Sequence, residues 1–225
     1  NAHSLSYYAK RDKAAVKRRA RKLANIRRLA TDVEMLAIQE TWFRMDEANA
    51  LKAELKGHAL FYSNSAAGGH LGCAMVAGPR LVRDFVLEQV ATPDSLRGRA
   101  VLVRGVSNVG GEGFCSLNVH FPNSPALRLA FLRELRAWPE LASSGRVYVL
   151  GDFNFVLDAD DSSSGSLDSV SRTFREEWGD FALWLGLAEV DQDSHTWFRI
   201  SKDMTTGLSR RLDRIHVSMD AAEMA

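Results

Sequence analysis

The stretch VYVLGDFNFVLDADD, from Val147 to Asp161, carries four apolar residues directly into Gly, Asp and Asn. An apolar run of this length, bounded by turn-forming residues, predicts a buried strand. Asp152 and Asn154 are two positions apart, so their side chains share one side if the chain stays extended. A carboxylate and an amide at the tip of a core strand can hold a metal ion or a phosphate. The stretch therefore predicts a functional site at the end of this strand.

The rest of the chain predicts a mixed α/β architecture. Consecutive β-type runs in the middle of the chain argue against a simple doubly wound parallel sheet, and helices flank these runs on both sides. We expect helices over residues 10–30 and 44–56, from Ser124-Pro125 onward, and along Val170, Phe174, Trp178, Phe181 and Leu185. We expect strands at VEMLAIQE, ALFYS, LGCAMVA, RAVLVRGV, GFCSLNVHF, VYVL and RLDRIHVS.

The charge of the chain is unevenly distributed. Net charge is +1, and the composition, 46% apolar and 25% charged, is that of a globular protein. Residues 1–30 nevertheless carry ten Lys/Arg and one acidic residue, whereas the remainder carries 19 basic and 27 acidic residues. A basic segment on an acidic body indicates a polyanionic partner, with a solvated helix face as the alternative.

Several classes of protein are disfavoured by what the sequence lacks. No run approaches the ~18–20 apolar residues that a membrane span needs, and there is no signal-peptide pattern. There is no P-loop, no GxGxxG and no CxxC pair. Cys73 and Cys115 both lie in apolar, strand-like runs, which favours buried reduced thiols. We therefore expect an intracellular protein with no membrane partner.

Two other predicted strands carry polar groups where apolar residues are usual. In LAIQE, Glu40 follows an almost wholly apolar run and is a candidate site residue. The alternative is that Glu40 is a solvated residue at the edge of the sheet. In FCSLNVHF, Ser116, Asn118 and His120 share one face. That face could meet water, with His120 in a structural role, or it could belong to a site.

The final predicted strand, RLDRIHVS, places Asp213 on the same face as Ile215 and Val217. An ionised carboxylate on an apolar face is costly unless it is paired, hydrogen-bonded or bound to a metal. His216 lies on the other face and is interpreted as structural. Asp161 is interpreted as a solvated turn residue, with a structural contact within the turn as the alternative. Four such strand ends at one rim would suit Mg²⁺, which takes oxygen ligands and keeps several waters.

Four motifs carry a family resemblance that spans nearly the whole chain. QET (Gln39–Thr41), NVHFPN (Asn118–Asn123), GDFN (Gly151–Asn154) and RLDRIHVS (Arg211–Ser218) resemble the endonuclease/exonuclease/phosphatase superfamily, in the same order. AIQETWF, HTWF and GDFN followed by an acidic turn look most like the endonuclease domains of LINE-type (non-LTR) retrotransposons, although Ser162 stands where Arg is usual. The resemblance implies a single DNase I-like domain over residues 1–225. It would be a four-layer α/β sandwich of two packed, mostly antiparallel sheets with outer helices.

The resemblance also implies roles for individual residues. A divalent cation, Mg²⁺ or Mn²⁺, would be held chiefly by Glu40, with Asn1 and Asp213 assisting. Asp152 would orient the attacking water or help to deprotonate it. The remaining expected contacts are to substrate phosphate, from His120, Asn154, Asn118 and Arg214.

The reaction implied by the resemblance is hydrolysis of a DNA phosphodiester by in-line attack of water, leaving a 3′-hydroxyl and a 5′-phosphate. In a retrotransposon such a nick in duplex DNA primes reverse transcription, so we expect a nuclear site of action and a fused reverse transcriptase. One alternative keeps the chemistry but changes the substrate: an abasic-site endonuclease, or a phosphatase acting on phosphoinositides or other esters. Another alternative is a degenerate DNA-binding domain without catalysis.

The chain departs from the family pattern at its end. The family closes with a Ser-Asp-His strand whose His is central to catalysis, and none of the six histidines here stands in such a motif. Asp213 is followed by only 12 residues. We therefore expect residues 1–225 to lack the start of the first strand and the Ser-Asp-His strand, and to be inactive or impaired alone.

Overall fold

A computed structural model describes residues 13–41, 43, 45–65, 71–142, 145–165, 170–200 and 207–219 of the chain. The chain divides into two compact units, residues 1–118 and 119–225. Hydrogen bonds join the strands in the orders β1-β3-β2, β10-β9 and β4-β5-β6-β7-β11-β8, and the boundary between the units falls within β6. The fold is therefore the predicted α/β arrangement of two main sheets, of three and six strands, that are mostly antiparallel and accompanied by helices.

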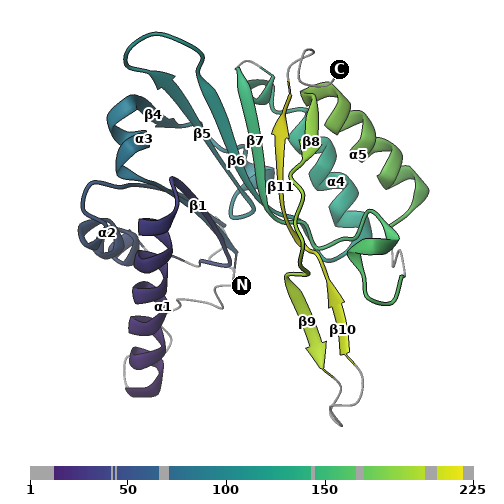
Figure 1. Cartoon of the computed structure of the whole chain (residues 1–225), viewed down its shortest axis with the longest axis horizontal. Helices are drawn as coiled ribbons and strands as arrows, with labels where there is room; N and C mark the ends of the chain where they lie inside the picture. The colour runs from purple at the N-terminus through teal and green to yellow at the C-terminus, as the bar shows by residue number, and fades with distance from the viewer. Residues whose placement is uncertain are drawn as a thin grey trace. The chain divides into compact units, whose positions relative to one another are not determined.

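The first unit is built on strand β3, whose six residues are all buried. Against one face of its sheet pack α1 and α2, through a cluster that includes Ile26, Leu51 and Val76 (Figure 1). Against the other face lies β5, through Met75 and Val101. The elements of this unit are α1 (Lys13–Asp32), β1 (Met35–Gln39), α2 (Met45–Glu54), β2 (Ala59–Asn64), β3 (Gly72–Ala77), α3 (Pro79–Asp84), β4 (Phe85–Gln89), η1 (Asp94–Leu96), β5 (Ala100–Ser107) and most of β6 (Phe114–His120).

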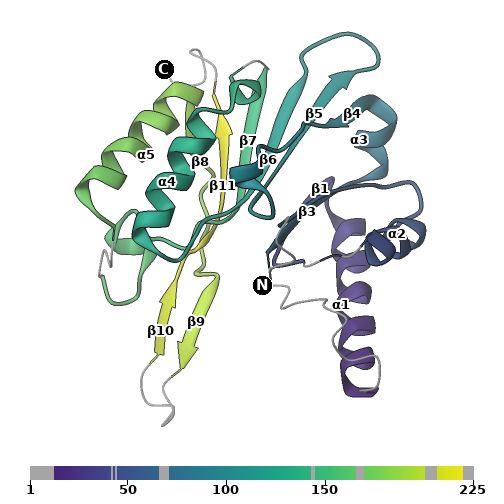
Figure 2. The same cartoon turned by 180° about the vertical axis from the view of Figure 1, so that it is seen from behind.

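In the second unit, α4 and α5 cover one face of the strands β7, β11 and β8 (Figure 2). Between helices and strands lies an aromatic cluster in which Phe121 stacks on Phe153 at 5.4 Å and Trp178 meets Phe153 edge-on at 5.5 Å. The elements are α4 (Pro125–Arg136), η2 (Pro139–Leu141), β7 (Arg146–Asp152), η3 (Ala159–Asp161), α5 (Arg172–Leu185), β8 (Leu187–Glu189), β9 (Trp197–Ile200), β10 (Gly207–Arg210) and β11 (Asp213–Ser218).

Local sequence explains the ends of α5. Ser171 caps its first turn, because its hydroxyl accepts a hydrogen bond from the Phe174 amide at 3.1 Å. Gly186 ends it in the left-handed region, with φ 64°. The apolar stripe predicted for this helix is buried along its whole length.

Every helix and strand predicted from the sequence is present, with ends that differ by a few residues. Within the described residues, the short elements that were not predicted are α3, β4, β8, β9, β10 and the 3-10 turns η1, η2 and η3. Cys73 and Cys115 are both fully buried, as expected. None of the helices in the described ranges combines the length and apolar character needed to cross a membrane.

Candidate active site

Strand β6 is buried on both of its faces. Ser116, Asn118 and His120 expose 2%, 0% and 5% of their surface, so their shared face does not meet bulk water. Polar groups in such a position must find partners within the protein. The alternative of a solvated polar stripe is therefore wrong.

In the first unit, Asn118 is held by the backbone and side chains around it. Its Oδ1 accepts a hydrogen bond from Gln39 Nε2 at 2.7 Å, and its Nδ2 donates to the carbonyls of Ile38 at 3.1 Å and Ala74 at 2.8 Å. Both amide hydrogens are thus used inside the unit. Asn118 ties β1 and β3 to β6, and this structural role takes the place of the expected substrate contact.

Glu40 stands at the end of β1, directly after this anchored Gln39. Its backbone has φ 54°, and the following Thr41 amide donates to the Gly72 carbonyl at 3.0 Å. A left-handed conformation costs a residue with a Cβ about 1–2 kcal/mol. Among the residues that the structure describes, Glu40 and Asn154 are the non-glycine residues with positive φ. Such strain persists where the surroundings over-determine it, which is frequent at functional sites.

In the second unit, Asp152 and Asn154 come together by a turn and not by the extended geometry that we expected. β7 ends at Asp152, and the amide of Asn154, whose φ is 53°, donates to Asp152 Oδ1 at 3.0 Å. Asn154 Nδ2 donates to the Phe121 carbonyl at 2.9 Å, while the Phe121 amide donates to the Asp152 carbonyl at 2.9 Å. Phe121, the residue after His120, is therefore hydrogen-bonded to both Asp152 and Asn154.

Asp213 joins this set through the sheet. It is paired Cα to Cα with Asp152 across β7 and β11, and the Phe153 amide donates to the Leu212 carbonyl at 2.8 Å. Thr196 Oγ1 accepts hydrogen bonds from the amides of Leu212 at 3.1 Å and Asp213 at 2.9 Å. The second unit thus gathers four of the predicted site residues at adjoining strand ends: His120, Asp152, Asn154 and Asp213.

Gly151 of the GDFN motif is required by the packing of β7. Its φ is 143°, and a Cβ at this position would lie 2.0 Å from the Val119 carbonyl oxygen. No side chain fits such a contact, so only glycine allows β7 to approach Val119 here. The glycine thereby sets where Asp152 begins the turn to Asn154.

The buried face of β11 is opposite to the one expected. Ile215, on the face of Asp213, is 42% exposed, whereas Arg214 and His216 are 1% and 3% exposed. The expectation that Asp213 sits on a buried apolar face is therefore wrong. His216 packs against the rings of Phe153 and Trp178, as its structural interpretation required.

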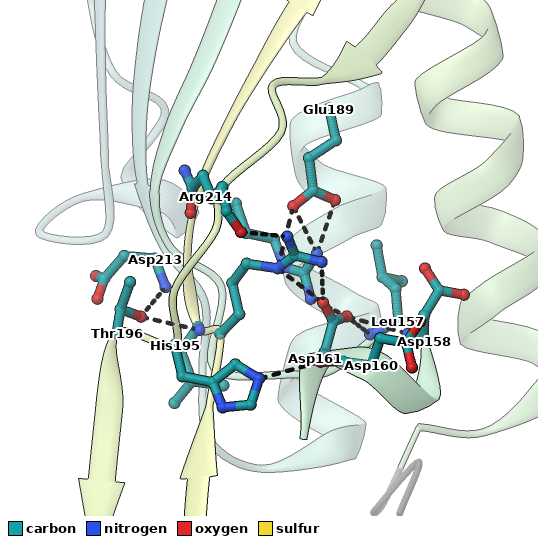
Figure 3. Close-up of polar contacts among 12 residues, drawn as sticks. Leu157, Asp158, Asp160, Asp161, Glu189, His195, Thr196, Asp213 and Arg214 are labelled. Carbon is teal, nitrogen blue, oxygen red and sulfur yellow. Dashed lines mark hydrogen bonds and ion pairs between the residues drawn. The ribbon is translucent and has the colours of Figure 1, made fainter. Parts of the chain in front are cut away.

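Arg214 is bonded to two carboxylates inside the second unit (Figure 3). Its Nη2 donates to Asp161 Oδ2, and its Nη1 donates to Glu189 Oε1 at 2.8 Å and Oε2 at 2.7 Å. Asp161 is fully buried, so its interpretation as a solvated turn residue is wrong. Since the Arg214 side chain is fully buried, its contacts take the place of the expected phosphate contact.

Arg128 is a further residue at this site, and the sequence pattern did not reveal it. From α4, its Nη2 donates to the carbonyls of Asn123 at 2.9 Å and Asn154 at 3.0 Å, and its Nε donates to Pro122 at 3.2 Å. Its guanidinium lies 5.5 Å from the Phe155 ring centroid, and burial lowers its pKa. Arg128 therefore joins the loop after His120 to the turn at Asn154.

The predicted metal ligands are only partly described. Asn1 lies outside the described residues, and Glu40 belongs to the first unit. No three or more His, Cys, Asp and Glu side chains gather into a metal-binding group within the described ranges. Mg²⁺ is usually held through one or two carboxylates and keeps several waters. The carboxylate of Asp213, which stands opposite Asp152 across β7 and β11, is an oxygen donor of the kind that this requires.

Comparison with solved structures places the fold in a known group. The endonuclease domain of TRAS1, a telomere-specific non-LTR retrotransposon, is 16% identical, with 89% of this chain and 79% of that chain covered and a TM-score of 0.59. The 3′ phosphatase NExo from Neisseria, bound to a product DNA hairpin, is 23% identical, with 88% and 81% covered and a TM-score of 0.63. A mannosyl-6-phosphatase from Bacteroides thetaiotaomicron is 15% identical, with 96% and 83% covered and a TM-score of 0.59.

None of the curated proteins compared with the chain matches its sequence. A family model does match, over residues 1–218 and so through both units. Members of this family are hydrolases of phosphodiester or phosphate ester bonds and generally use divalent metal ions. The chain belongs to the Endonuclease/Exonuclease/phosphatase family.

Proposed function

We propose that this protein is a Mg²⁺-dependent endonuclease that nicks duplex DNA, of the type found in non-LTR retrotransposons. The observation that carries the proposal is the convergence of His120, Asp152, Asn154 and Asp213 at adjoining strand ends of one unit. Carboxylate, amide and imidazole groups at one place are the set needed to hold a phosphate ester and activate a water against it.

Each residue of this set has a separate task in the proposal. Asp152 orients the attacking water and accepts its proton. Asn154 donates a hydrogen bond to a phosphate oxygen, from a backbone that the turn to Asp152 holds in place. His120 contacts the scissile phosphate. Because these groups are positioned before substrate arrives, little reorganisation is needed during the reaction.

We propose metal-ligand roles for Glu40, with Asn1, and for Asp213, as the motif resemblance implies. When bound, the ion would polarise the phosphorus–oxygen bond and stabilise the leaving oxyanion. The strained backbone of Glu40 supports its assignment, since a left-handed φ at a non-glycine strand end is a feature of functional positions.

DNA is proposed as substrate on two grounds. The motifs QET, GDFN with its acidic turn, and HTWF look like the retrotransposon endonucleases, and TRAS1 is among the proteins of similar fold. The basic helix α1 at the start of the chain is also suited to a polyanion, since Lys and Arg contacts to phosphates supply sequence-independent affinity. A reverse transcriptase in the same polypeptide and a nuclear site of action remain part of this proposal.

The proposal is tested by nicking of supercoiled plasmid. The assay uses the complete gene product, because the resemblance places a catalytic His in a Ser-Asp-His motif and none of the histidines of residues 1–225 stands in one. We expect nicking that requires Mg²⁺ and leaves 3′-hydroxyl ends. Asp152→Asn should slow it by on the order of 10²-fold or more, as for loss of a general base.

The matched control is Asp180→Asn, the same substitution at an exposed position of α5 in the same unit, which should leave nicking unchanged. The outcomes also separate the alternatives. Much faster cutting of an abasic duplex indicates a repair-type enzyme, and release of inorganic phosphate from monoesters without nicking indicates a phosphatase. Salt-sensitive DNA binding with no hydrolysis of any ester would show a non-catalytic domain and overturn the proposal.

A further inference from the structure

A partly buried ion network joins the loop after Asn154 to the start of β11. Asp161, from this loop, is fully buried and accepts hydrogen bonds on both oxygens. Its Oδ1 accepts from Arg211 Nε at 2.9 Å and Nη2 at 2.7 Å. Its Oδ2 accepts from Arg214 and from the amides of Leu157 at 2.8 Å and Asp158 at 3.0 Å.

The network is balanced in charge. Glu189 of β8 receives both Nη1 bonds of Arg214, and its Oε1 lies 3.8 Å from Arg211 Nε. Two arginines therefore face two carboxylates, Asp161 and Glu189. Charges in a buried place are tolerated only when paired in this way, and removal of one member leaves its partner uncompensated.

The two arginines flank Asp213 in the chain. Arg211 lies two residues before it and Arg214 directly after it, so the carboxylate of Asp161 fixes the backbone on both sides of Asp213. The backbone adds to this connection, since the Arg211 amide donates to the Asp161 carbonyl at 2.9 Å. Figure 3 shows Asp161 in contact with Arg214, which directly follows Asp213 on β11.

The same loop is tied down at a second point. His195 Nε2 lies 3.0 Å from the Asp160 carbonyl oxygen (Figure 3). The Nδ1 atom of His195 lies 2.7 Å from Ser209 Oγ. The Ser163 amide donates to the Ser209 carbonyl at 3.0 Å. Hydrogen bonds at Asp160 and Ser163 thus connect the loop after Asn154 to the segment that precedes Asp213.

We propose that Asp161 is a positioning residue, which sets Asp213 against Asn154 and Asp152 through Arg211 and Arg214. This inference rests on the proposed function and deepens it by adding a residue that holds a metal ligand in place. Asp161 does not touch substrate in this scheme. Its effect is transmitted through the backbone on either side of Asp213.

The substitution Asp161→Asn tests the proposal, because it keeps the size of the side chain. The amide nitrogen would be placed against N–H donors, and two arginines would face one carboxylate. Loss of groups that orient a metal ligand commonly costs about 10–100-fold in metal affinity or activity. We expect the dissociation constant for Mn²⁺, measured by titration of its paramagnetic resonance signal in the absence of DNA, to rise about tenfold. In the plasmid assay kcat should fall by about 10–100-fold.

The matched control is Ser171→Ala, which removes the cap of α5 in the same unit and costs about 1 kcal/mol of stability away from the network. The Mn²⁺ dissociation constant and the kcat of Ser171→Ala should equal those of the unaltered protein. If Asp161→Asn does not fold, Arg214→Lys keeps the positive charge but cannot bridge two carboxylates with one planar group. It should shift Mn²⁺ binding in the same direction.

The outcomes distinguish this inference from the proposed function. Mn²⁺ binding and kcat equal to those of Ser171→Ala, in Asp161→Asn or in Arg214→Lys, would refute the positioning role while the endonuclease proposal stands. Absence of both Mn²⁺ binding and nicking in the unaltered full-length protein would refute the proposed function, and with it this inference.

Discussion

Asp152 and Asp213 stand directly opposite each other, Cα to Cα, across the antiparallel strands β7 and β11. Like charges at opposed positions of a sheet are destabilising, by up to about 1 kcal/mol. A divalent cation would remove this repulsion. The arrangement therefore links the stability of the second unit to the metal that we assign to Asp213.

The first prediction follows from this pair. Asp213→Asn should raise the free energy of unfolding in EDTA by roughly 0.5–1 kcal/mol, because one of two opposed charges is removed. It should also abolish most of the stabilisation that Mg²⁺ gives to the unaltered protein. Urea unfolding with EDTA or with Mg²⁺ measures both effects, and Asp180→Asn is the control. A less stable Asp213→Asn with an undiminished Mg²⁺ effect would contradict the assignment.

The sequence was sufficient for the main elements of the fold because their side chains repeat with the period of the structure they form. In α5, Phe174, Trp178 and Phe181 are spaced at three or four residues, and all three are buried. The missed elements are short: β4 has five residues and β8 has three. Short runs give only a weak periodic signal, and their pairing partners decide their conformation.

Site residues were predicted by position along the chain more readily than by orientation. The strand end at Asp152 followed from the apolar run before it, but its turn to Asn154 depends on a hydrogen bond between the two residues. In β11, an arginine and a histidine occupy the buried face while Ile215 is exposed. Only the carboxylates supplied by distant segments, Asp161 and Glu189, make that burial of Arg214 possible.

In α4, too, the sequence did not predict every side chain that is buried. Leu127, an apolar residue near the start of the helix, is 59% exposed, whereas Arg128 beside it is 2% exposed. Arg128 is buried because three carbonyl oxygens from loops on either side of β7 accept its hydrogen bonds. A periodicity argument assigns such a residue to the surface, since the acceptors belong to other segments.

The second prediction concerns Gly151. Gly151→Ala should destabilise the protein by several kcal/mol, because its Cβ would overlap the Val119 carbonyl oxygen and its φ of 143° suits only glycine. The matched control is Gly179→Ala on the exposed side of α5, where a Cβ meets nothing within 4 Å. That substitution should stabilise the protein by up to about 1 kcal/mol, through helix propensity. Chemical denaturation measures both, and a tolerated Gly151→Ala would show that β6 and β7 are not so closely packed.

The third prediction concerns Arg128. Arg128→Met keeps most of the apolar contact with Phe155 but leaves buried carbonyls without their donor, at a cost of about 1–3 kcal/mol for each unsatisfied group. Nicking should also slow, because the carbonyl of Asn154 loses its anchor. Arg133→Met, on the same helix but in an exposed pair with Glu177, should change neither property much. Equal effects of the two substitutions would remove Arg128 from the site.

The fourth prediction is a dependence of stability on pH that arises from His216. Burial, followed by the neighbouring charge of Arg214, lowers the pKa of His216 from 6.5 to about 4. Between these values the unfolded chain binds a proton that the folded protein excludes, so stability increases with pH across this interval. The contribution of His216 is therefore complete above about pH 6.5 and is lost as the pH falls toward 4. A difference of this size corresponds to on the order of 3 kcal/mol.

His216→Gln should therefore flatten the pH dependence of the free energy of unfolding between pH 4 and 6.5, whatever it does to stability at neutral pH. The matched control is Ser218→Ala on the same strand. It removes the hydroxyl that accepts the Val147 amide at 2.7 Å and costs about 1 kcal/mol without removing a titrating group. The free energy of unfolding of Ser218→Ala should change with pH in parallel with that of the unaltered protein. Urea unfolding at half-unit intervals of pH decides the matter: if His216→Gln retains the original slope, the proton uptake belongs to another group.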